Sequence, residues 1–274
     1  MEKPSAVMPP LFMSANWFTE KQMTELFVAG LQQGVRGFDT AREYGAEAIV
    51  GRALRKALQE TGVRREEIFV QTRISNEEII KGHIYDEVHR SIDKMRMDYV
   101  DCFMFHWPTP DYWIPAWKQL EVVYDKYDFI QSIGMCNCRK RHLLQMEKER
   151  ALMPHILQIE IQPFWQANDV VDYCQTHNIA VQAFSPLCKM IEPIRSNAVL
   201  EKIASVHGVS IPQVILKWHV QRGVSPISLS SKVSRVKENF NLSSFMLSEE
   251  EMSEIKKLDC GYKYHLESAT CIGY

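Results

Sequence analysis

Short apolar segments alternate with amphipathic helical patterns along almost the whole of this 274-residue chain. Each apolar segment has the length and composition of a buried strand: residues 11–14, 35–38, 67–72, 99–105, 129–135, 156–161, 179–184 and 224–227. Repeated strand–helix units with short connections predict an α/β fold, a single (β/α)8 TIM barrel over residues 1–274. A doubly wound open sheet is the alternative. It would normally have a G-x-G-x-x-G turn after its first strand, and this chain has none.

Capping signals mark the starts of two helices. Thr19 is followed three residues later by Gln22, which predicts a capping box in front of a core-facing apolar stripe. Gly34 is expected to end that helix. Ser248 and Glu251 give the same signal near the C-terminus, and they predict a further helix there.

Composition and charge argue against several classes of protein. A net charge of −2 and a pI near 6.5 provide no basic field for nucleic acid or for an anionic membrane. No apolar run approaches the ~20 residues that span a bilayer, and the N-terminus lacks the apolar core of a signal peptide. The seven cysteines are an odd number, and Cys136-x-Cys138 has no second pair at zinc spacing. We therefore expect a cytoplasmic protein with reduced thiols and no metal, nucleic-acid or membrane partner.

Asp39 and Tyr44 form the first candidate site. The strand at 35–38 delivers Asp39 at its C-terminal end, and Tyr44 follows five residues later. A carboxylate and a phenol can form a proton-donating unit, but a phenol with a pKa of ~10 is a poor acid until a nearby charge shifts it.

Other polar residues stand at the ends of the following strands. The ends in chain order are Ser14/Ala15, Asp39, Thr72/Arg73, His106, Cys136/Asn137, Gln158/Glu160, Phe184/Ser185 and Ile227/Ser228. In a barrel these ends meet at one mouth, where the chemistry of this fold takes place. Asp39, Tyr44, Arg73 and His106 come from three successive strands and are the candidate catalytic group.

The chain resembles the aldo-keto reductase family over almost its whole length. The resemblance rests on GVRGFDTAREYGAEAIVGRAL, DYVDCFMFHWP, IGMCN, QIEIQP, AFSPL and PQVILKWHVQRGVSPISLSSKVSRVKENF, in family order and spacing. It implies a (β/α)8 barrel that binds NADP(H) across its mouth and transfers hydride from the nicotinamide to an aldehyde or ketone. The family's catalytic set is Asp, Tyr, Lys and His.

The resemblance assigns roles to the candidate residues. It makes Asp39 the catalytic Asp and Tyr44 the general acid, while His106 orients the carbonyl. Trp107 is expected to form an apolar wall of the substrate pocket, and Trp17 to line its mouth.

The resemblance also implies a set of cofactor residues. Asn137 and Gln158 would hold the nicotinamide carboxamide, and Phe184 would stack on the ring where the family usually has Tyr. Ser185 and Leu187 match the loop that covers the pyrophosphate, and Ser230 matches a further cofactor position. Arg235, Glu238 and Asn239 match the residues at the adenosine end.

Several residues depart from the family pattern. Arg73 stands in place of the catalytic Lys, and a bulky, planar guanidinium is not a conservative replacement for a compact ammonium. On one interpretation Arg73 pairs bidentately with Asp39 and still polarises Tyr44; on the other, carbonyl reduction is impaired or replaced. Leu229 replaces the Lys that contacts the 2′-phosphate, which predicts a weakened preference for NADP(H) and tolerance of NAD(H). Ser14 and Cys136 are further changes around the cofactor.

Two functions follow. The first is NAD(P)H-dependent reduction of a small-molecule aldehyde or ketone, with Tyr44 as proton donor. The alternative is a protein that has lost net reduction and performs redox-neutral acid–base chemistry (isomerisation, dehydration or cyclisation) or only binds a ligand. In either case we expect a monomer or a weak oligomer.

Overall fold

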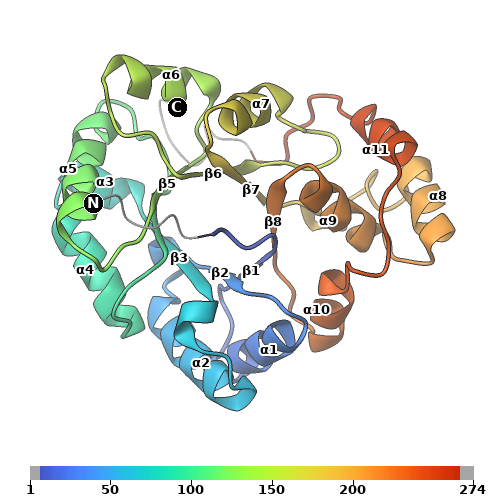
Figure 1. Cartoon of the computed structure of the whole chain (residues 1–274), viewed down its shortest axis with the longest axis horizontal. Coiled ribbons are helices and arrows are strands. Elements are labelled where there is room, and N and C mark those ends of the chain that lie inside the picture. Colours follow the sequence, from blue (N-terminus) through green and yellow to red (C-terminus); the bar gives the residue numbers. More distant parts are fainter. Residues whose placement is uncertain (1–6, 266–274) are drawn as a thin grey trace.

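Eight parallel strands close into a barrel in the computed structural model, which describes residues 7–265 (Figure 1). The strands are β1 (Phe12–Ser14), β2 (Gly37–Asp39), β3 (Phe69–Ile74), β4 (Cys102–Phe105), β5 (Ile133–Cys136), β6 (Ile156–Glu160), β7 (Ala180–Phe184) and β8 (Val224–Ser228). Each strand pairs with its neighbours in chain order, and β1 also pairs with β8. The predicted (β/α)8 barrel is confirmed, and the open-sheet alternative is excluded.

Helices surround the strands as an outer ring in Figure 1. They are α1 (Glu20–Gln32), α2 (Glu47–Thr61), α3 (Asn76–Lys81), α4 (Ile84–Met95), α5 (Trp113–Lys126), α6 (Lys140–Lys148), α7 (Asn168–Thr176), α8 (Ala198–His207), α9 (Ile211–Gln221), α10 (Val233–Phe240) and α11 (Glu249–Lys256). Short 3-10 turns are η1 (Arg42–Tyr44), η2 (Arg65–Glu67) and η3 (Cys188–Met190). The pattern does not predict α3, because six residues between Ser75 and Gly82 are too few to show a helical period.

Both expected capping boxes are present. Thr19 Oγ1 accepts from the backbone N–H of Gln22, whose side chain accepts from the Thr19 backbone N–H. Ser248 and Glu251 make the same reciprocal pair at the start of α11. Gly34 follows α1 with a φ of 82°, which is the left-handed conformation expected after a helix.

The third strand is displaced from its predicted bounds. Residues 67–72 were the expected span, whereas β3 begins at Phe69 and continues to Ile74. Glu67 belongs to η2 instead, because its carboxylate accepts from the Arg64 backbone N–H at 2.9 Å and holds the chain in a turn. Arg73 therefore lies inside the strand, where its side chain is buried.

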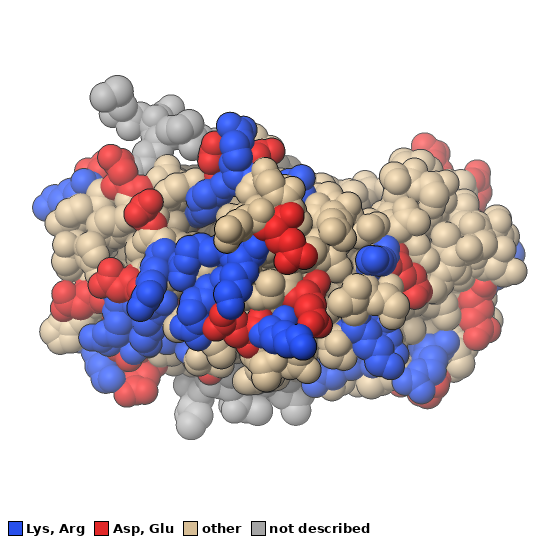
Figure 2. Space-filling view, turned by 90° about the horizontal axis from the view of Figure 1, so that it is seen from below, with Lys and Arg blue, Asp and Glu red and all other residues tan. Residues whose placement is uncertain are grey.

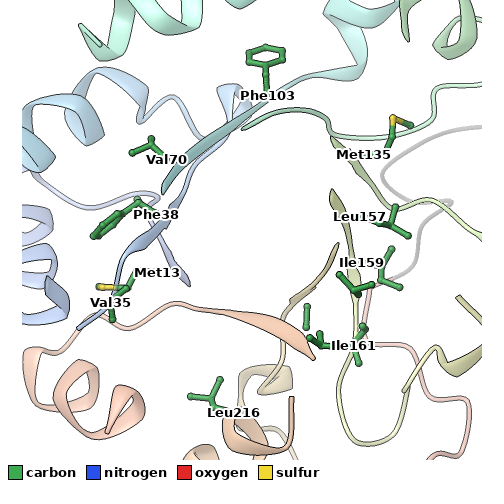
Figure 3. Packing of buried hydrophobic residues seen from close by; sticks show 14 of the residues in the cluster. Met13, Val35, Phe38, Val70, Phe103, Met135, Leu157, Ile159, Ile161 and Leu216 are labelled. Carbon is green, nitrogen blue, oxygen red and sulfur yellow. The ribbon is translucent and has the colours of Figure 1, made fainter. Parts of the chain in front are cut away.

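The apolar core has two parts. The larger one lies between the strands and the surrounding helices, and Figure 3 shows Phe38, Val70, Phe103 and Leu157 pointing away from the barrel axis into it. The smaller one fills the barrel interior, with Phe12, Phe69, Cys102, Met104, Cys136, Ile156 and Ile227. Buried polar side chains from β2, β3, β6 and β7 form a separate hydrogen-bonded layer inside the barrel. The polar layer carries the candidate site.

Gly51 sets the contact between α2 and α4. A Cβ placed on Gly51 would lie 2.0 Å from the backbone oxygen of Met95, so only glycine allows this approach. Since α2 directly follows η1, the contact fixes the segment that carries Tyr44.

The described surface has mixed charge. Figure 2 shows Lys and Arg side chains gathered on one face and interspersed with Asp and Glu. On α1 and α2, at the bottom of Figure 1, Glu20 pairs with Arg52 at 2.7 Å and with Lys56 at 2.6 Å. These contacts lower the pKa of Glu20 to about 2.

Within residues 7–265 no single helix is long and apolar enough to cross a membrane. The α8–α9 pair meets that test only when the two helices are taken together, across an 89° bend.

Candidate active site

The structure brings the four candidate catalytic residues together. Arg73, on β3, donates from Nη2 to Asp39 Oδ1 on β2, and both side chains are almost completely buried. The guanidinium carbon lies 5.8 Å from the centre of the Tyr44 ring. The His106 ring, at the end of β4, packs edge-on against Tyr44 with 6.4 Å between ring centres. The strand-end pattern therefore located one contiguous group.

The bidentate pairing expected between Arg73 and Asp39 is wrong. Arg73 divides its nitrogens among several acceptors: Nη1 bonds Gln158 Oε1 and Nε bonds the Thr40 backbone oxygen at 3.3 Å. Asp39 Oδ1 also accepts from Gln71 Nε2 at 2.6 Å. Because Asp39 shares this oxygen among several donors, the fork-to-fork geometry does not form.

Three fully buried glutamines support Asp39 and Arg73. Gln71 and Gln182 exchange two hydrogen bonds of 2.9 Å across the barrel interior. Gln158 donates to Gln182 Oε1 at 3.0 Å and to Asp39 Oδ1 at 3.2 Å. A closed network of this kind fixes side-chain positions, because any member left unpaired in the interior is costly. Only Gln158 is among the sequence candidates; the signal for the other two is a glutamine inside a buried strand.

Opposing effects act on the pKa of Tyr44. Burial raises that pKa, and the positive charge of Arg73 works against the increase. The net result lies above the ordinary value, so Tyr44 keeps its proton throughout the neutral range.

His106 has an acidic neighbour that the sequence reasoning missed. Glu43 Oε2, on η1, lies 3.0 Å from His106 Nδ1. Burial lowers the pKa of His106, although the contact with Glu43 opposes the decrease. Burial would raise the pKa of Glu43, but the contact with His106 brings it below its ordinary value. The sequence feature that could have indicated this contact is the carboxylate directly before Tyr44.

The turn that carries Tyr44 is anchored by ion pairs to α3 and α4. Arg42, in η1, lies 3.4 Å from Glu78 Oε1 of α3 and 3.3 Å from Glu87 Oε2 of α4. Both carboxylates are buried, and Arg42 helps to compensate them together with Lys81, beside Glu78, and Arg90, beside Glu87. The ion pairs hold η1, and therefore Glu43 and Tyr44, against the helices.

The two substrate candidates differ in exposure. Trp17 is 79% exposed, and its ring centre lies 6.0 Å from that of Tyr44, so it stands at the edge of the group. Trp107 directly follows His106 and is 4% exposed, which makes it part of the wall behind the group.

The carboxamide candidates lie at the ends of β5 and β6. Asn137 is buried with a φ of 60°, and its Nδ2 donates to the His106 backbone oxygen at 2.9 Å. Gln158 is fully buried, and both polar atoms of its amide are bonded to Arg73, Asp39 and Gln182.

The segment at Tyr264 and His265, where the described residues end, lies against the end of β7. Ser185 Oγ and His265 Nε2 are 2.8 Å apart, and the Phe184 and His265 ring centres are 5.4 Å apart. Glu160 holds this segment by accepting from the backbone N–H groups of Tyr264 at 2.7 Å and His265 at 2.9 Å. Leu187 lies beyond Ser185, immediately before η3.

The remaining cofactor candidates lie on or before α10. Ser230 precedes the helix, where its Oγ accepts from the Lys232 backbone N–H at 3.3 Å. Arg235 and Glu238 are exposed and Asn239 is buried. Among the described residues, no hydrogen bond or ion pair links this set to the catalytic group, so the structure places it separately.

The described part of the barrel suits a nicotinamide cofactor. Arg235 is an exposed guanidinium without an ion pair to any described side chain, on a helix whose N-terminus has no side-chain cap. Both features suit a phosphate group. Phe184, partly exposed at the end of β7, presents an aromatic ring at the same end of the barrel strands as the catalytic residues. In residues 7–265 no group of three His, Cys, Asp or Glu side chains converges to hold a metal ion.

The Arg73–Asp39 ion pair beside the partly buried Tyr44 phenol is an arrangement suited to acid–base chemistry. The sequence profile of the Aldo/keto reductase family matches residues 13–259. The chain is similar to a methylglyoxal reductase of Yersinia pestis, with 34% identity covering 93% of this chain and 90% of that protein. It is also 34% identical to a glyoxal reductase of Bacillus subtilis, covering 87% of this chain and 84% of that protein.

Solved structures agree with this relationship. An aldo/keto reductase from Brucella melitensis is 31% identical, with a TM-score of 0.79 over 92% of this chain and 95% of that one. An aldo-keto reductase from a Medee basin deep-sea metagenome library is 29% identical, with a TM-score of 0.87 over 93% of each chain. The chain therefore belongs to the aldo/keto reductase family. Membership confirms the expected NAD(P)H-dependent oxidoreductase class, and it does not favour the redox-neutral alternative.

Proposed function

We propose that the protein reduces small 1,2-dicarbonyl compounds of the methylglyoxal and glyoxal type to hydroxycarbonyl products. The observation that carries this proposal is the buried Arg73–Asp39 pair beside the Tyr44 ring, with His106 on the edge of that ring. The substrate class is supported by the names of the relatives from Yersinia pestis and Bacillus subtilis.

Carbonyl reduction needs a proton donor. Negative charge develops on the carbonyl oxygen, and a positioned acid must neutralise it. In our proposal the Tyr44 hydroxyl donates that proton and Arg73 stabilises the phenolate left behind. Asp39 and the glutamine network keep Arg73 in place, while His106 orients the substrate beside Trp107 and Trp17.

The bound cofactor supplies the hydride. Asn137 and Phe184 would hold its nicotinamide, Ser185 and Leu187 its pyrophosphate, and Ser230, Arg235, Glu238 and Asn239 its adenosine end. Gln158 Nε2 can donate to the carboxamide only by giving up a bond inside the barrel, since Asp39 and Gln182 take both of its hydrogens. Gln158 Oε1 has one lone pair left for the carboxamide, because the other accepts from Arg73. We therefore expect weaker nicotinamide binding than an unoccupied glutamine would give.

The preference for NADPH over NADH is expected to be small. Leu229 is 44% exposed at a position where the family has a Lys, so Arg235 alone among these residues offers a cation to a 2′-phosphate. A single charged contact of this kind contributes about 1–3 kcal/mol.

We further propose that the chain is a single domain that acts as a cytoplasmic monomer or weak oligomer, without a nucleic-acid or membrane partner. The small net charge supports this proposal, as do the free cysteines of the described residues, which are all buried except Cys260. Size-exclusion chromatography with light scattering tests the oligomeric state; a stable tetramer would overturn it.

Cofactor titration tests the proposed function independently of turnover. NADPH and NADH are added separately while tryptophan fluorescence is followed, and the exposed Trp17 beside Tyr44 provides a reporter at the barrel mouth. We expect saturable binding of both, with Arg235→Ala weakening NADPH more than NADH. Arg52→Ala, which removes an exposed arginine of α2 together with its ion pair to Glu20, is the control for loss of a surface cation elsewhere. The absence of binding at millimolar cofactor would refute the proposal.

A further inference from the structure

Glu43 is the carboxylate that lies against the Nδ1 atom of the His106 ring. The 3.0 Å separation between Glu43 Oε2 and His106 Nδ1 joins η1 to the end of β4. The His106 side chain is 13% exposed and that of Glu43 37%, so the contact is only partly shielded from water. In the part of the chain that the structure describes, His106 Nδ1 is buried and has no hydrogen-bond partner, and the carboxylate oxygen within ion-pair distance of it is Glu43 Oε2. A carboxylate so close to a ring nitrogen selects the tautomer in which that nitrogen carries hydrogen.

The neighbouring charges act on His106 from several elements. Glu43 and Tyr44 approach from η1, Asp39 from β2 and Arg73 from β3. Glu43 and Asp39 favour the protonated ring, whereas burial and Arg73 oppose it. Glu43 makes the closest contact of these groups, so its removal is expected to change the protonation of His106 most.

We propose that Glu43 is a positioning residue: its carboxylate accepts hydrogen from His106 Nδ1, fixes that tautomer and stabilises the imidazolium beside Tyr44. This inference rests on the proposed reduction, because it assigns the charged ring a part in turnover. In the neutral tautomer, Nε2 has a lone pair and cannot donate to a carbonyl oxygen. Only the imidazolium donates from Nε2 while Nδ1 stays bonded to Glu43. Reduction therefore requires the form of the protein in which His106 is protonated and paired with Glu43.

The placement of Glu43 is supported by the rest of its turn. Arg42 holds η1 between Glu78 and Glu87, and Gly51 allows the close packing of α2 on α4 directly after it. The Glu43 carboxylate is thus presented to His106 from an anchored segment. This arrangement reduces the conformational entropy lost in forming the pair.

The test compares Glu43→Gln with Glu43→Asp. Imidazole signals of the protein labelled with ¹⁵N-histidine are followed through a pH titration, and His106→Asn identifies the signal of residue 106. We expect Glu43→Gln to lower the pKa of His106 by about 1 pH unit and to reduce the Nδ1–H tautomer. Glu43→Asp, which keeps a carboxylate, should retain part of both effects. Glu60→Gln removes an exposed carboxylate from α2 and serves as the control.

Turnover provides the second readout. In the wild type, kcat should decrease as the pH rises through the pKa of His106. Glu43→Gln should move that decrease about 1 pH unit lower, which reduces kcat about tenfold at neutral pH. An unchanged His106 titration in Glu43→Gln would overturn the inference. If the wild type bound and reduced nothing, the proposed function would fail, but the titration would still show whether Glu43 controls His106.

Discussion

Arg73 donates a hydrogen bond to Asp39 inside the barrel, and its guanidinium lies 5.8 Å from the centre of the Tyr44 ring. The charge that the family usually places on Lys is therefore still present beside the phenol. Its geometry is different, because the guanidinium also bonds Gln158 and the Thr40 backbone. Each consequence of this difference can be measured.

Removing the charge of Arg73 is expected to destabilise the barrel. Arg73→Met leaves the Asp39 carboxylate buried without a cation, so the free energy of unfolding should fall by about 3–5 kcal/mol. Arg73→Lys keeps the charge, and its loss of stability should be smaller. It also frees Gln158 Oε1 and should tighten NADPH binding. Urea denaturation and fluorescence titration measure the two effects; equal stability of both variants would contradict the ion-pair account.

The glutamines inside the barrel should behave as a coupled pair. Gln71→Leu or Gln182→Leu alone leaves part of the partner amide unsatisfied and should cost about 1–3 kcal/mol of stability. The double variant removes both halves of the Gln71–Gln182 exchange, so its loss should be less than the sum of the two single losses. Urea denaturation of all four proteins gives the coupling energy. Strict additivity would mean that the two amides do not depend on each other.

His142 predicts a specific sensitivity to acid. Its Nδ1 accepts from the Arg139 backbone N–H at 3.0 Å and so caps α6. Burial, with the charges of Arg141 and Arg139, lowers the pKa of His142 to about 4. Because this folded-state pKa lies below the unfolded value near 6.5, the stabilisation is complete above pH 6.5 and is lost as the pH falls toward 4. From pH 7 to pH 5 the contribution should fall by about 2 kcal/mol.

The matched variant for that prediction is His142→Gln. Glutamine keeps an acceptor at the third position of the helix but does not titrate. The wild type should lose more unfolding free energy than this variant between pH 7 and pH 5. An equal loss in the two proteins would assign the acid sensitivity to other groups.

Glu160 should control the attachment of the segment at Tyr264 and His265. Its two oxygens accept from the backbone N–H groups of Tyr264 and His265. Glu160→Gln removes one acceptor and places an amide N–H against a backbone donor, at a cost of about 1–2 kcal/mol. Trypsin should then cleave after Lys263 about tenfold faster, since cleavage follows the open population. An unchanged rate, relative to the Glu60→Gln control, would show that Glu160 does not hold the segment.

The sequence was informative where local rules decide the structure. The alternation of apolar segments and helical patterns predicted the barrel, and the strand ends predicted that Asp39, Tyr44, Arg73 and His106 meet. It named Asp39 as a partner of Arg73 but could not predict Gln158 or the Thr40 backbone. Those partners depend on which side chains of different strands face one another across the interior, and this register comes only from the closed sheet.

Two further contacts were not predicted from the sequence, for a related reason. Glu43 meets His106 because η1 folds over the end of β4. His265 reaches Ser185 because Glu160 holds the His265 backbone at the end of β7. Both contacts join segments far apart in the sequence through single polar groups, and no periodic pattern records them. The assigned roles of the site residues remain predictions until they are measured.

Turnover of methylglyoxal by the wild type and by Tyr44→Phe tests the central claim most directly. Purified protein is mixed with NADPH and methylglyoxal, and cofactor oxidation and product formation are followed together. We expect the wild type to form one hydroxycarbonyl product for each NADPH oxidised. Tyr44→Phe should lower kcat by about 10²–10⁴-fold without weakening NADPH binding. Equal turnover by the two proteins, or NADPH binding without any reduction by the wild type, would contradict the account.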